Sequence, residues 1–119
     1  MTRKELTNKR DLTFSGWIRE KLPDSSSGFM VSDLDFILSN YKTKKIMLLE
    51  IKTRLANLKT WQRNLFEQLS GWLEKGMDSD WQYLGFNVVY FTGTNFTDGD
   101  VFFNKQSVTE DELIKILSF

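Results

Sequence analysis

The chain has 119 residues, of which 40% are hydrophobic and 27% charged, so it has the size and composition of one globular domain rather than of a disordered or fibrous chain. It contains no cysteine and no histidine, which excludes disulfide frameworks, thiolate metal sites, Ser-His-Asp triads and Cys-His pairs. The formal net charge is zero, which counts modestly against a nucleic-acid-binding protein, although local basic clusters matter more than the sum.

The N-terminal part of the chain is expected to hold a basic segment and a helix. Residues 1–10 are polar and basic, and we expect them to be flexible. Helical spacing is shown by four apolar residues: Phe14, Trp17, Ile18 and Leu22. They predict a helix over residues 11–22, which ends before Pro23. The chain shows neither the hydrophobic region of a signal peptide nor an apolar run of about 20 residues, so we expect a cytoplasmic, intracellular protein without a membrane partner.

Two strands are expected next, joined by a short polar turn. Residues 29–39 are predicted to be extended, and alternation from Asp33 onward places Asp33, Asp35 and Ile37 on one face. Residues 45–53 are predicted to form the second strand, whose nearly continuous apolar side chains indicate a central strand buried on both faces. The short connection makes these two strands a hairpin.

The second half of the chain predicts one long helix, two strands and a short last helix. The long helix is predicted over Lys59–Lys75, with Gly76 as its C-terminal cap. The two strands are predicted over Leu84–Thr92 and Asp100–Asn104. The last helix opens with a capping box at Thr109–Glu112 and runs through Leu117. The resulting order is α-β-β-α-β-β-α, in a single domain that spans residues 1–119. We therefore expect an α/β fold in which a sheet has helices on both faces.

Charged side chains interrupt the most apolar strand of the chain. Glu50 and Lys52 are two residues apart, so they point to the same face of the predicted strand. Buried charges are costly unless they are paired or metal-bound. Asp35, on the neighbouring strand, can face Glu50, and a divalent cation would relieve the repulsion between the two carboxylates. The alternative is a buried ion pair, Glu50–Lys52 or Asp35–Lys52, without catalysis.

The two segments Ser32–Leu38 and Leu48–Arg54 resemble the signature of the PD-(D/E)XK nuclease superfamily, which is an Asp on one strand followed by Glu/Asp-x-Lys on the next. The resemblance covers roughly residues 11–92. It implies a restriction-endonuclease-like core, αβββαβ with a central mixed sheet, in which one core strand is unassigned or merged into residues 29–39. The proline that usually precedes the family's Asp is absent, because Leu34 stands there.

The resemblance also implies roles for individual residues. Asp35 and Glu50 would bind Mg²⁺ or Mn²⁺, with the carbonyl of Ile51 as a further ligand, and without cysteine or histidine such oxygen ligands are the ones available. Lys52 would position or deprotonate the attacking water and stabilise charge on the phosphorane. Asp33 competes with Asp35 for the first role, and we favour Asp35 because its apolar neighbours place it deeper in the predicted strand.

Two further positions follow from the family's helices. The helix after the lysine often carries a Gln, and we favour Gln62 over Gln68 because Gln62 lies within the apolar arc of the helix and near its start. The first helix often supplies an acid. Glu20 has the preferred residue type but turns away from the apolar face, whereas Asp11 points better and equally suits an N-cap.

The function implied is a divalent-metal-dependent deoxyribonuclease that hydrolyses DNA phosphodiester bonds. The small size resembles phage or viral members of the superfamily, which implies action in an infected host cell and a possible homodimer. A catalytically silent nucleic-acid-binding or protein-adaptor module on the same fold is the alternative. A third possibility, an interaction protein with no nucleic-acid role, would suit the zero net charge.

Overall fold

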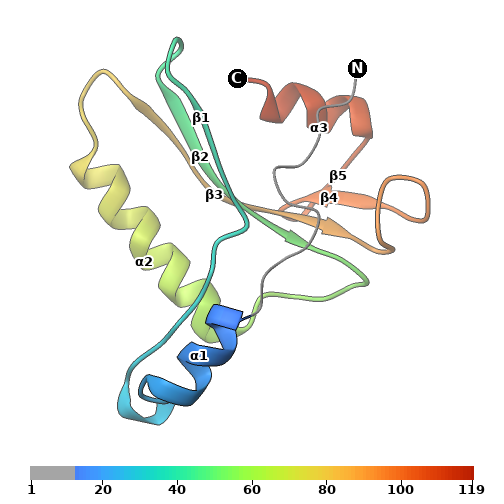
Figure 1. Cartoon of the computed structure of the whole chain (residues 1–119). Coiled ribbons are helices and arrows are strands. Elements are labelled where there is room, and N and C mark those ends of the chain that lie inside the picture. The colour runs from blue at the N-terminus through green and yellow to red at the C-terminus, as the bar shows by residue number, and fades with distance from the viewer. Residues whose placement is uncertain (1–12) are drawn as a thin grey trace. The chain divides into compact units, whose positions relative to one another are not determined.

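The chain divides into two compact units, residues 1–32 and residues 33–119, of which the computed structural model describes residues 13–119 (Figure 1). The first unit holds helix α1, Thr13–Lys21, and a single 3-10 turn, η1, Ser25–Ser27. The predicted helix over residues 11–22 is therefore confirmed where it can be compared. The carboxylate of Asp24 accepts a hydrogen bond from the Ser26 N–H and caps η1, in a segment for which sequence predicted only a loop.

The second unit is built on one five-stranded mixed sheet in the order β1-β2-β3-β4-β5. The strands are β1 Phe36–Asn40, β2 Lys45–Lys52, β3 Gln82–Phe91, β4 Val101–Phe103 and β5 Gln106–Val108. β2 and β3 pair in parallel, because helix α2, Thr60–Gly76, carries the chain back between them. All other neighbours pair antiparallel. The expected α/β class and the hairpin of the first two strands are confirmed.

Each face of this sheet packs against a helix. One cluster joins Leu113 of α3, Glu110–Leu117, to alternate residues of the strands, among them Leu49 and Val89. On the opposite face Phe66 of α2 packs with Val88. Residues 47–50 of β2 are all buried, so the prediction of a central strand covered on both faces is confirmed. Figure 1 shows α2 and α3 on the two sides of the strands.

The first strand is shorter than predicted. β1 begins at Phe36, residues 29–34 have no regular structure, and Asp35 lies in a bend. The physical reason is that the Asp35 N–H, instead of pairing with a backbone carbonyl of β2, donates to the side chain of Glu50. Asp35 was predicted to lie deeper in the strand than Asp33, and this prediction is wrong, since both residues precede β1.

Two other details differ from the sequence prediction. The strand predicted over Asp100–Asn104 is β4, and a turn connects it to a further strand, β5, which was not predicted. Asn104 in this turn has φ +57°, a conformation that asparagine tolerates better than most residues. The order is thus α-β-β-α-β-β-β-α. Gly76 is the last residue of α2 rather than its cap, because Met77 is the C-cap, with extended backbone and an N–H that donates to Leu73. Across residues 13–119, no helix is both long and apolar enough to span a membrane.

Candidate active site

The side chains of Glu50 and Lys52 lie on the α2 face of the sheet. Glu50 is in register with Val88 and Lys52 with Tyr90, and both of these β3 residues belong to the cluster beneath α2. Only 4% of the Glu50 surface is exposed, whereas Lys52, at the end of β2, is half-buried. The prediction that the two charged side chains share one face of the strand is therefore confirmed.

Asp35 and Glu50 are held together by two reciprocal hydrogen bonds. The Asp35 N–H donates to Oε1 of Glu50 over 2.7 Å, and the Ile51 N–H donates to Oδ2 of Asp35 over 2.9 Å. Each carboxylate thus accepts a backbone N–H from the other's segment, and each has one oxygen outside this pair of bonds. The arrangement fixes two acidic groups side by side at the start of β1 and near the end of β2.

The surroundings of Glu50 oppose its ionisation. Burial raises the pKa of the Glu50 carboxyl above its ordinary value, and the negative charges of Asp35 and Asp33 act in the same direction. The hydrogen bond from the Asp35 N–H and the positive charge of Lys52 lower that pKa but do not cancel the effect of burial. A buried carboxyl facing a second carboxylate is a group that a divalent cation would stabilise in its charged form.

The two candidates for the first acidic role affect Glu50 to different degrees. Asp35 is anchored to β2 through Ile51, and its charge raises the pKa of Glu50. Asp33 and Asp35 are both exposed, but among the causes of the Glu50 pKa shift the charge of Asp33 makes the smallest contribution. The choice of Asp35 as the first acid stays a prediction, which now depends on its contact with β2 and not on depth in the strand.

No family model, no curated protein and no solved structure matches this chain. The assignment of the site therefore depends on its geometry and its chemistry.

The start of α2 contributes a residue that the sequence analysis missed. Nη2 of Arg63 donates to Oη of Tyr90 over 3.0 Å, and Tyr90 is the cross-strand neighbour of Lys52. Gln62, the favoured helix Gln, is half-buried in the same first turn, whereas Gln68 is exposed further along the helix. The only sequence signal for Arg63 was its position next to Gln62.

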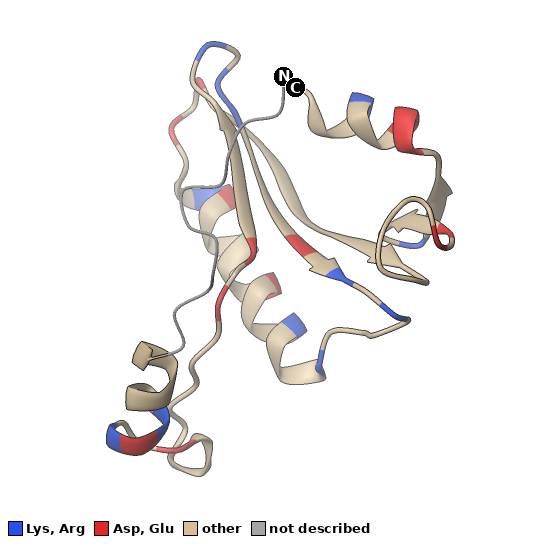
Figure 2. Cartoon of the chain, turned by 45° about the vertical axis from the view of Figure 1, so that its right-hand side comes forward, with Lys and Arg blue, Asp and Glu red and all other residues tan. Residues whose placement is uncertain are grey.

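Basic residues gather after Glu50 along the chain. They are Lys52, Arg54, Lys59 and Arg63, at the end of β2, in the following loop and in the first turns of α2. Figure 2 shows these basic segments beyond the acidic segment of β2. The zero net charge of the whole chain hides this local grouping.

Both candidates for the acid of the first helix belong to the first compact unit, residues 1–32. Glu20 is exposed on α1 and belongs to the first compact unit, whereas Asp35 and Glu50 belong to the second. Asp11, the other candidate, lies outside the described residues.

The donor set suits a hard cation, although it is small. Within residues 13–119, no group of three or more Asp, Glu, His or Cys side chains is placed to hold a metal. Asp35 and Glu50 together offer two carboxylates, each with one oxygen outside their reciprocal bonds, and the Ile51 carbonyl would complete an all-oxygen set with water. Mg²⁺ commonly binds in this way, through one or two carboxylates and several waters.

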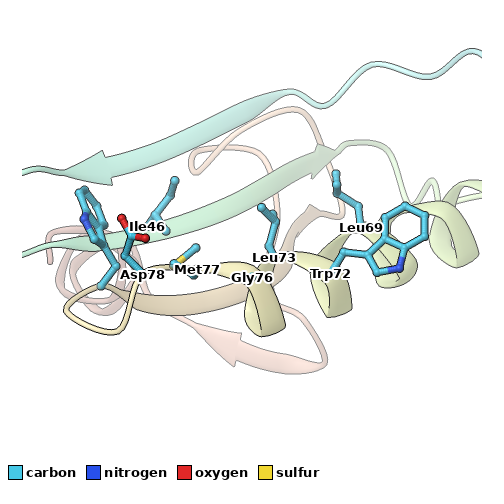
Figure 3. A pocket seen from close by; sticks show the side chains of 8 residues that line it. Ile46, Leu69, Trp72, Leu73, Gly76, Met77 and Asp78 are labelled. Carbon is cyan, nitrogen blue, oxygen red and sulfur yellow. The ribbon is translucent and has the colours of Figure 1, made fainter.

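An apolar cavity of the second unit lies away from the acidic pair. It has a volume of about 490 Å³ and is lined mainly by apolar side chains from the second half of α2 and by Ile46 of β2 (Figure 3). None of the predicted site residues lines it. The acidic pair and Lys52 are therefore not part of this apolar groove.

Proposed function

We propose that this protein is a divalent-metal-dependent nuclease that hydrolyses DNA phosphodiester bonds, with a PD-(D/E)XK arrangement of side chains. The observation that carries the proposal is the reciprocal hydrogen bonding of Asp35 and Glu50, with Lys52 on the same face of the same strand. A structural ion pair would need only one carboxylate beside the lysine. Two carboxylates locked together, one of them buried, favour a cation site.

The topology around the motif supports a restriction-endonuclease-like core. β2 carries Glu50 and Lys52 inside a mixed sheet, between β1 and β3, and the parallel β2–α2–β3 crossover follows directly. One feature departs from the family's αβββαβ order. Between α1 and α2 the described residues form two strands instead of three, because residues 29–34 are not a strand.

Each residue has a role that its position explains. Asp35 and Glu50, with the Ile51 carbonyl, would hold Mg²⁺ or Mn²⁺. A cation bound there would lower the pKa of a water molecule and polarise the scissile phosphate. The Lys52 ammonium group would orient the attacking water and stabilise the negative charge that develops on the phosphorane. Gln62, in the first turn of α2, would help to position the phosphate or the water.

DNA is the substrate we favour because of the local grouping of charge. Arg54, Lys59 and Arg63 follow Lys52 along the chain, and basic side chains of this kind bind backbone phosphates irrespective of base sequence.

The first test is cleavage of supercoiled plasmid, linear duplex, single-stranded and branched DNA with Mg²⁺ or Mn²⁺. We expect Lys52→Met to lower the rate of cleavage by about a hundredfold or more, because it removes a charge that acts in the transition state. Lys45→Met is the matched control, since Lys45 is the half-buried first residue of the same strand and lies away from the carboxylates.

A second pair of variants tests the choice of acid. Asp35→Asn should abolish metal-dependent cleavage, whereas Asp33→Asn should retain most of it, because the Asp35 carboxylate accepts the N–H of Ile51 next to Glu50. Equal losses in both variants would contradict the assignment. A folded wild type that binds DNA in a salt-dependent manner but cleaves none of these substrates would favour the adaptor alternative.

A further inference from the structure

A second, smaller cavity adjoins the candidate active site. Its volume is about 260 Å³. It is lined by the loop after β2 and by the ends of β3 and β4, and its polar residues include Asn57 and Asn104. Tyr90 and Phe102 supply two aromatic side chains. Nothing in the roles proposed above uses this cavity.

The cavity lies on the same row of the sheet as Lys52. Lys52 is in register with Tyr90 on β3, and Tyr90 is in register with Phe102 on β4. Neighbouring strands are about 4.8 Å apart, so the aromatic wall begins one strand away from the lysine. A nucleotide whose phosphate lies at Lys52 would therefore have its base within reach of the cavity.

The outer wall of the cavity is a tightly held loop. Arg54 and Leu55 have φ of +55° and +61°, a region that non-glycine residues enter at a cost. The Arg54 N–H donates to the carbonyl of Gly93 and the Leu55 N–H to that of Phe91, which fixes this turn over the end of β3. The next two residues of the loop, Ala56 and Asn57, then line the cavity.

The chemistry of the lining suits a nucleobase. Aromatic rings stack on any base, and an amide side chain can hydrogen-bond to a base edge. The Asn104 side chain is already engaged with Val88 and Asn87, so Asn57 is the amide that we assign to the ligand. The volume is below that of pockets for drug-sized molecules, which start at about 300 Å³, and so fits a single base better than a larger group.

We propose that this cavity binds one unpaired nucleobase of the DNA strand being cleaved, next to the scissile phosphate, an inference that depends on the proposed nuclease function. A base stacked and paired within a duplex cannot enter such a cavity without leaving the helix. The substrate class is therefore single-stranded DNA, or duplex DNA with an unpaired nucleotide at the cleavage position.

The test is a binding experiment without metal, so that it does not depend on cleavage. Fluorescein-labelled oligothymidylate is compared with an abasic strand that has the same number of phosphates, by fluorescence anisotropy. The full chain should bind the strand with bases at least about fivefold more tightly. Phe102→Leu removes the ring and keeps an apolar side chain, and it should bring the ratio of the two affinities close to one. Asn57→Ala should lower that ratio roughly threefold.

The controls separate this inference from the proposed function. Gln82→Ala, at the exposed opposite end of β3, should leave the ratio unchanged. If Phe102→Leu fails to fold by circular dichroism, the exposed Asn57 position decides the result. Equal affinity of the wild type for both strands would overturn the base-binding cavity even if the protein cleaves DNA. An affinity that depends on the bases, without cleavage of any substrate, would support the base-binding cavity and contradict the proposed nuclease function.

Discussion

At the scale of single residues, Glu50 carries the largest electrostatic cost in the candidate site. Its side chain is almost fully buried, and burial raises the pKa of the carboxyl above the ordinary glutamate value. Its native partners are the Asp35 N–H and the positive charge of Lys52, while the carboxylate of Asp35 acts against its ionisation. A residue kept in such surroundings is a reasonable candidate for function rather than for stability.

Glu50→Gln should therefore stabilise the protein without metal at neutral pH. The folded state binds the Glu50 proton more tightly than the unfolded chain, so this residue's contribution to stability is present below the ordinary glutamate pKa and is lost as the pH rises through the higher folded pKa. Above that pKa the variant should be more stable than the wild type and should unfold at a higher Tm, because glutamine has no charge to bury. Below the ordinary glutamate pKa the Tm values of the wild type and of Glu50→Gln should become equal. Thermal unfolding measured over a range of pH checks this.

We expect bound metal to reverse this order of stability. Mg²⁺ or Mn²⁺ should raise the Tm of the wild type by binding to the folded state, and Glu50→Gln should lose this shift. Glu74→Gln, an exposed position on α2, is the matched control and should change neither the pH profile nor the metal response. A metal shift that survives in Glu50→Gln would argue against Glu50 as a ligand.

At the scale of elements, the two helices of the second unit have separate tasks. α2 covers the face that carries Glu50 and Lys52, and its first turn reaches the site through the Arg63–Tyr90 hydrogen bond. α3 covers the opposite face through Leu113. Damage to α3 is therefore expected to affect stability without changing the chemistry of the site.

Thr109→Ala tests this division of tasks. The Thr109 hydroxyl accepts the Glu112 N–H, and the Glu112 carboxylate accepts the Thr109 N–H, so the capping box satisfies two N–H groups at the start of α3. Its loss should lower the free energy of unfolding by about 1 kcal/mol in urea denaturation. The control is Thr43→Ala, in the exposed β1–β2 turn. A change in cleavage by folded Thr109→Ala would contradict the separation of the two faces.

At the scale of the whole molecule, the chain separates between Ser32 and Asp33 into its two compact units. Residues 29–34 have no regular structure, and Phe29, Met30 and Val31 are exposed there. The predicted homodimer stays a prediction, which light scattering can check.

Limited proteolysis should first cut the chain near the boundary between the two compact units. We expect the first cuts between Pro23 and Leu34, which would leave a resistant fragment that begins near Asp33 and contains the whole sheet, because exposed segments without regular structure are cut first. Mass spectrometry of the products identifies the cuts. Early cleavage in the loop of residues 53–59 would show instead that the wall of the smaller cavity opens readily.

Much of the fold and the central motif could be predicted from the sequence because they depend on local patterns. Glu50 and Lys52 share a face because a strand alternates every two residues, whatever its neighbours are. The capping box of α3 likewise joins residues three positions apart. The apolar run of β2 was enough to indicate burial on both faces, which the structure confirms.

Only the tertiary structure decided which partners these residues have. Asp35 contacts groups 15 and 16 positions away, and Arg63 reaches Tyr90 over 27 positions. Such contacts depend on the register of the strands and on which backbone groups the sheet leaves unpaired. The alternation of polar and apolar residues predicts neither of these. For this reason the first strand was predicted from residue 29, whereas in the folded chain the Glu50 carboxylate accepts the Asp35 N–H and β1 begins only at Phe36.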